Sequence, residues 1–201
     1  MKKILPLFFV IFLWIPVQAQ EDDETTDPLT QAARAMNQRR FTEAEKIYAS
    51  LLLKTPQDVA LQQLWVHALI NLKRHDEADS MLRRMTDRDT NEGGNYWYRG
   101  LNFERQQKDS LAIGFFKLYI AKAGHKNGFN ISAWLHAGSG FRRMMHKDGI
   151  SNRQVEEMVY LFEQYIGLNP TDPYNTELEY FITEVKSRKP SSGRLVWDET
   201  N

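Results

Sequence analysis

Hydrophobic side chains recur every three or four residues over most of the chain, which is the spacing of one face of an α-helix. The pattern begins just after Pro28, a residue that suits a first helical turn, and Pro56 ends the second apolar segment. It then continues through Leu61 to Met85 and on beyond Phe162. The pattern predicts an all-α chain built from consecutive amphipathic helices.

The stretch Tyr96 to Ala121 predicts two helices folded back on each other. Gly100 lies inside the first of them, where a glycine costs about 1 kcal/mol relative to alanine. We interpret this glycine as a place where another backbone passes too close for a side chain. Ala112 supplies the small residue opposite, and Phe116 follows it by one helical turn.

Small residues repeat at a fixed distance along the chain. Ala44, Ala78 and Ala112 are separated by 34 residues each time (78 − 44 and 112 − 78). Each is followed four residues later by a large apolar side chain: Tyr48, Leu82 and Phe116. A constant period that carries the same residue types indicates a repeat architecture.

This 34-residue pattern resembles the tetratricopeptide repeat, a helix-turn-helix unit that stacks into a superhelix. The resemblance covers about Pro28 to Pro170 and implies an all-α, right-handed superhelix of about four units with a C-terminal capping helix. The expected units lie near residues 28–58, 59–92, 93–126 and 131–170, followed by the capping helix over 171–187.

The fourth unit departs from the pattern. Trp134, Gly138 and Phe141 repeat the spacing of the third unit's first helix. The distance from Phe141 to Phe162 is 21 residues (162 − 141), against 13 in the third unit (116 − 103), which leaves 8 extra residues (21 − 13). We therefore predict an inserted loop at His146 to Asn152.

The start of the chain has the features of a secretory leader. Lys2 and Lys3 precede an apolar run that is shorter than the ~20 residues needed to span a bilayer, and Ala19 offers a cleavage site. We expect residues 1–19 to be a signal peptide, with an uncleaved anchor as the alternative. Residues 20–27 are acidic and are expected to be a disordered lead-in. With zero cysteines, the chain fits an exported protein of a bacterial envelope, periplasmic or secreted.

At the other end, residues 188–201 predict a flexible tail. Leu195 to Trp197 form an apolar run within it, which could dock on the chain itself or on a partner. The net charge does not indicate a particular class of partner. The 26 basic and 26 acidic residues balance, so the chain has no strong electrostatic field to attract nucleic acid. We expect a protein or peptide partner, no nucleic acid, and no transmembrane span in the mature chain.

The resemblance also implies a binding site, because the first helices of successive units line a concave groove. Trp97 and Arg105 stand two turns apart on one such helix, a residue pair typical of interface anchors; the alternative is that Trp97 is a buried aromatic residue. The expected groove residues are Gln63, His67, Asn71, Trp97, Leu101, Arg105, Leu135, Ser139 and Arg142. The polar clamp with which some members hold a chaperone's carboxylate is absent, because its places hold Leu29, Ala33, Leu64, Gly94 and Tyr98.

No catalytic, cofactor or metal site is predicted. The five histidines include no pair at one-turn spacing. Asp87 and Asp89 start like a calcium loop, but Glu92 replaces the glycine that its turn requires. Ser139 between two glycines lies within a helix and lacks the strand-turn-helix context of a nucleophile.

These observations predict a non-catalytic protein-binding adaptor or scaffold of the cell envelope or secretion machinery. Three alternatives remain open. The first is an envelope glycan-binding module using Trp97, Trp134 and Arg142, which would need exposed, coplanar tryptophans. The second is an enzyme, and the third is a structural homo-oligomer with contacts at His146 to Asn152 or Arg194 to Trp197.

Overall fold

The structure is a computed structural model of the 201-residue chain. It describes residues 27–123, 130–188 and 193–197. The predicted signal peptide and nearly all of the acidic lead-in lie outside these residues. The elements are α1 (Pro28–Asn37), α2 (Phe41–Lys54), α3 (Val59–Asn71), α4 (His75–Arg88), α5 (Gly93–Arg105), α6 (Asp109–Ala123), α7 (Ser132–Asp148), β1 (Ile150–Ser151), α8 (Asn152–Leu168), α9 (Asn175–Arg188) and β2 (Arg194–Leu195).

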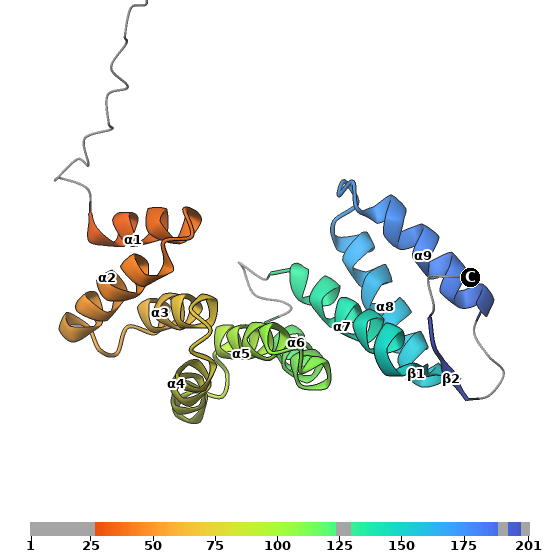
Figure 1. Cartoon of the computed structure of the whole chain (residues 1–201), viewed down its shortest axis with the longest axis horizontal. Helices are drawn as coiled ribbons and strands as arrows, with labels where there is room; N and C mark the ends of the chain where they lie inside the picture. Colours follow the sequence, from red (N-terminus) through yellow and green to blue (C-terminus); the bar gives the residue numbers. More distant parts are fainter. Residues whose placement is uncertain (1–26, 124–129, 189–192, 198–201) are drawn as a thin grey trace, which may run out of the picture.

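The helices follow one another along an arc, with α1 at one end and α9 near the other (Figure 1). Each helix packs against the next one in the chain, and α3 also contacts α5. They form four hairpins, α1–α2, α3–α4, α5–α6 and α7–α8, and α9 covers the last of these. Because each helix contacts only helices that are near it in the chain order, the molecule is a linear helical array. The all-α prediction is confirmed.

The turns of the first three hairpins share one backbone geometry. Arg39, Lys73 and Gln107 have positive φ angles of 59°, 61° and 58°, and they lie 34 residues apart (73 − 39 and 107 − 73). In each turn the next residue donates its backbone N–H to a carbonyl five residues back, from Arg40 to Ala35 and equivalently in the other two. This bond satisfies a carbonyl that the helix end would leave unpaired. The 34-residue period of the sequence therefore corresponds to a repeated turn geometry as well as to repeated side-chain packing.

The alanines that define the period are fully buried. Ala44, Ala78 and Ala112 each have 0% exposed surface. The large side chains one turn later are buried with them: Tyr48, Leu82 and Phe116.

Gly100 and Gly138, which occupy equivalent positions in α5 and α7, each lie against an aromatic ring. A Cβ atom on Gly100 would lie 2.6 Å from the ring of Phe116, and one on Gly138 would lie 2.6 Å from the ring of Phe162. We interpreted Gly100 as the place of a close backbone contact opposite Ala112. That interpretation was wrong, because the group that lies closest to Gly100 is the ring of Phe116. The rings of the second helices occupy the space that a side chain would need.

The fourth hairpin contains no inserted loop. Instead α7 and α8 have 17 residues each, and only Gly149 to Ser151 connect them. Gly149 ends α7 with a φ of 70°, and Ser151 starts α8 through a capping box with Gln154. The prediction of a loop at His146 to Asn152 was wrong, because the extra residues lengthen the helices.

Part of the predicted flexible tail is docked on the body of the protein. Leu195 in β2 pairs antiparallel with Ile150 in β1 and is 8% exposed. The Trp197 ring lies 5.7 Å from the ring of Phe181 and 4.4 Å from the guanidinium of Arg188. Alternate residues of the tail thus cover the apolar end of α7, α8 and α9. This corrects the tail prediction for residues 193–197.

Candidate protein-binding surface

The predicted groove residues are distributed evenly over three first helices, with three on each of α3, α5 and α7. Arg105 is exposed, and the other eight are half-buried. None is enclosed in the core. The local contacts of each residue separate those that are free to meet a partner from those that hold the array together.

A polar cluster joins α3 to α5. The Gln63 amide donates hydrogen bonds to Asn95 Oδ1 (3.2 Å) and Glu92 Oε1 (3.4 Å). Gly94 leaves room for this amide, because a Cβ there would lie 2.5 Å from Gln63 Nε2. One turn further along α3, the His67 ring lies 5.7 Å from the ring of Tyr98 on α5.

Arg105 completes this cluster at the end of α5. Its positive charge helps to lower the pKa of the His67 imidazole. Arg105 makes no hydrogen bond or ion pair with any residue that the structure describes. We call Gln63, His67, Tyr98 and Arg105 the α3–α5 cluster. Sequence reasoning missed Tyr98, whose only signal was its place in the run Tyr96 to Tyr98.

The α3–α5 cluster makes stability depend on pH. Burial, and then the charge of Arg105, hold the pKa of His67 below its usual value of 6.5. As the pH falls below about 6.5, the unfolded chain binds a proton at His67 before the folded chain does, so the free energy of unfolding should fall. The His67→Gln variant should lose this part of the dependence below about pH 6.5 in denaturant titrations, whereas an identical slope in both proteins would contradict the assignment.

Trp97 lies in a cluster of rings. Its ring is 5.4 Å from Phe116, 5.6 Å from Tyr119 and 5.3 Å from His136, with the last pair in a T-shaped arrangement. These rings come from α5, α6 and α7. The geometry favours the interpretation of Trp97 as a packing residue over that of an exposed anchor.

A charged network beside these rings also connects α5 to α7. His136 Nδ1 lies 2.8 Å from Glu104 Oε2, and Arg143 reaches both Glu104 (2.9 Å) and Asp109 (2.7 Å). Burial pushes the pKa of Glu104 up, but the hydrogen bond from His136 and the charges of His136 and Arg143 outweigh it and hold this pKa below its usual range. The network was not predicted, because its residues have no common spacing in the sequence.

The remaining predicted residues have local roles. The Asn71 amide donates to the carbonyl of His67 in its own helix (2.8 Å), and Leu135 packs against the core. Arg142 lies over the ring of Phe181 (4.5 Å) and reaches Glu177 of α9 at 3.4 Å. Ser139 is half-buried on α7. Arg142 thus joins α7 to the capping helix.

Glycan binding would require exposed, coplanar tryptophans, and Trp97 and Trp134 do not have this arrangement. Trp134 packs against the ring of Tyr160 at 6.0 Å and an angle of 76°, and Trp97 packs against the rings of Phe116, Tyr119 and His136. The two therefore do not form an exposed, coplanar platform.

The described residues also contain no group of three or more histidines and carboxylates that could hold a metal ion. Within the same part of the chain, no helix combines the length and the hydrophobicity needed to cross a membrane.

The array of helical hairpins with a partly accessible polar face defines a protein-interaction scaffold. Residues 35–98 match the family model of the tetratricopeptide repeat. This segment is therefore built from tetratricopeptide repeats.

Solved structures share the fold. The crystal structure of MamA protein has a TM-score of 0.59 and 15% identity, covering 80% of this chain and 81% of that one. MamA MSR-1 C2 gives 0.56 and 15%, with 80% and 84% covered. A further crystal structure of MamA gives 0.54 and 14%, with 78% and 92% covered. At these identities the likeness shows the superhelical fold, as predicted. A search among curated proteins finds no match.

Proposed function

We propose that the protein is a non-catalytic adaptor or scaffold that holds a peptide or helix of a partner protein against α3, α5 and α7. The observation that carries the proposal is the α3–α5 cluster. It brings an amide, an imidazole, a phenol and a guanidinium together from two successive first helices, all partly or fully accessible. Such side chains provide the directional contacts by which interfaces recognise a partner.

Arg105 is the residue that we expect to contribute most to this binding. Its guanidinium is exposed, and no carboxylate among the described residues pairs with it. Arginine is enriched at interface hot spots because its planar group forms several hydrogen bonds at once. Trp97 contributes indirectly, by fixing the position of α5 against α6 and α7.

We also propose that the adaptor works outside the cytoplasm, in the cell envelope or a secretion assembly. The support is the sequence of residues 1–19, with two lysines, a short apolar run and small residues at the expected cleavage site. The absence of cysteine is compatible with a bacterial envelope, because such a chain depends on its core alone.

Affinity capture from an envelope extract tests this function. The bait is the chain from Gln20 to Asn201, compared with the variants Arg105→Glu and Arg153→Glu. Arg153 is an exposed arginine on α8 and provides a matched charge reversal away from the cluster. We expect Arg105→Glu to reduce recovery of the partner about tenfold or more, while Arg153→Glu retains it. Equal recovery with all three baits would contradict binding at the α3–α5 cluster.

A further inference from the structure

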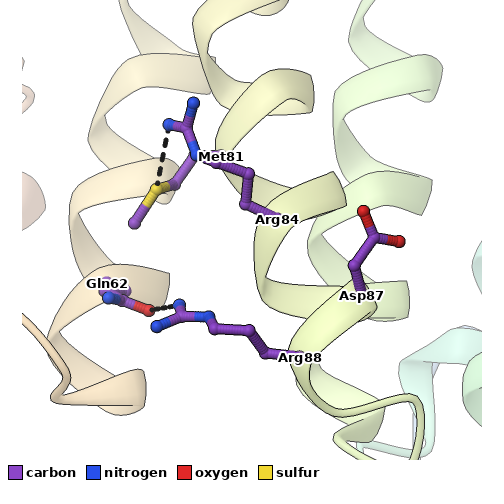
Figure 2. A pocket seen from close by; sticks show the side chains of 5 residues that line it. All are labelled: Gln62, Met81, Arg84, Asp87 and Arg88. Carbon is purple, nitrogen blue, oxygen red and sulfur yellow. Dashed lines mark hydrogen bonds between the residues drawn. The ribbon is translucent and has the colours of Figure 1, made fainter.

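A second surface lies on the α3–α4 hairpin, at the end where α3 begins and α4 ends. A hollow of about 430 Å³ is lined there by Gln62 of α3 and by Met81, Arg84, Asp87 and Arg88 of α4. Figure 2 shows the side chains of Arg84 and Arg88 extending toward α3, while the carboxylate of Asp87 is directed to the other side of α4. None of these residues belongs to the α3–α5 cluster.

Both arginines that line the hollow lack a carboxylate partner in the described part of the chain. The Arg84 guanidinium contacts only Ser80 Oγ (3.4 Å) and Met81 Sδ (3.5 Å). The Arg88 guanidinium donates to two neutral amide oxygens, those of Gln57 (2.5 Å) and Gln62 (2.8 Å). By contrast, the neighbouring Arg83 is paired with Asp79 at 2.7 Å.

This arrangement is costly without an anion. Arg84 and Arg88 stand one helical turn apart on one face of α4, where like charges destabilise a helix. A carboxylate would offset this repulsion, and it is a stronger acceptor for a guanidinium than the sulfur and amide oxygens now in place. Gln62 is 2% exposed and holds the Arg88 side of the hollow through its own bond to the Pro56 carbonyl.

We propose that this hollow is a docking site for an acidic segment of a partner protein, which carries an apolar side chain beside its carboxylates. The carboxylates pair with Arg84 and Arg88, and the apolar side chain lies on Met81. The protein then has two recognition surfaces, since the hollow is separate from the α3–α5 cluster. A scaffold with two surfaces can hold two partners, or two parts of one partner, at the same time.

Arg84 is the residue on which to test the hollow. Arg88 also lines a smaller hollow of about 170 Å³ together with Asp89 and Glu92, and its bonds to Gln57 and Gln62 hold the start of α3. Replacing it would therefore disturb the fold as well as the charge. Arg84 is exposed and bonds only within its own helix, so Arg84→Gln removes the charge and leaves the packing intact.

The experiment measures fluorescence anisotropy of a labelled hexapeptide of four glutamates and two leucines, with the glutamine version as the uncharged probe. The purified protein is compared with Arg84→Gln and with Arg83→Gln, the matched loss of one positive charge on the next residue. We expect the protein to prefer the acidic peptide. Arg84→Gln should weaken its binding about fivefold, the value of one ion pair of about 1 kcal/mol, while Arg83→Gln leaves it within twofold.

Equal weakening by the two variants would overturn the proposal, because it would show a general charge effect. Equal binding of the acidic and uncharged peptides would overturn it as well. A third outcome tests whether the acidic residues Glu21 to Glu24 occupy the hollow. If changing all four to their amides tightens peptide binding in a way that needs Arg84, the occupant is this chain itself and the assignment to a partner is wrong. None of these results depends on Arg105. The capture experiment with Arg105→Glu therefore tests the proposed function independently of this hollow.

Discussion

Replacing Gly100 with leucine is expected to lower the free energy of unfolding by about 3 kcal/mol. A Cβ at this position would lie 2.6 Å from two atoms of the Phe116 ring, which has 0% exposed surface and cannot move aside. The leucine would therefore push α5 away from α6, the helix with which it forms the third hairpin. Urea unfolding followed by circular dichroism measures the change.

Gly114→Leu provides the control for this substitution. Gly114 lies on α6 and is exposed, and a Cβ there would meet no other side chain within 4 Å. Leucine there should raise stability by up to about 1 kcal/mol, because it is a better helix former than glycine. If Gly100→Leu and Gly114→Leu change stability equally, the close packing of Gly100 on Phe116 is wrong.

Truncating Trp97 to alanine is expected to destabilise the array by about 3 kcal/mol, since it removes a large ring from a half-buried packing cluster. The ring touches Phe116, Tyr119 and His136, which belong to two different hairpins. The loss should therefore loosen the contact of α5 and α6 with α7, and thermal unfolding should show it as a lower midpoint. If Trp97 were instead an exposed anchor of the groove, this variant would fold almost normally.

Two observations separate the packing role of Trp97 from an anchor role. Trp97→Phe should recover a large part of the lost stability, because phenylalanine fills much of the same space. Partner capture at a temperature where Trp97→Ala remains folded should be close to normal. Unchanged unfolding together with lost capture would instead establish Trp97 as an exposed anchor of the groove.

The repeat was predictable because its signals are local. Ala44, Ala78 and Ala112 recur with the period of one hairpin, since each must fit the same close helix contact. The left-handed residues at 39, 73 and 107 follow the same period, although their side chains give no hint of it. Helix type and repeat length follow from such spacings, because one hairpin forms from residues adjacent in the chain.

The candidate site was only partly predictable. Helical periodicity placed all nine expected residues on first helices and outside the core. It could not distinguish Arg105, which pairs with nothing in the described residues, from Arg142, which is held by Glu177 of α9. Both are arginines in the second half of a first helix, and the difference depends on what the following helices present to each.

By itself, then, the sequence determined the helices, the 34-residue repeat and the face on which polar residues gather, because each depends on neighbours along the chain. Only the tertiary structure decided that a ring fills the space beside Gly100, that Leu195 docks on β1, and that Arg84 and Arg88 face a hollow. These features join residues from different helices or distant segments. Their geometry depends on how the hairpins stack and where side chains find partners, which no spacing in the sequence records.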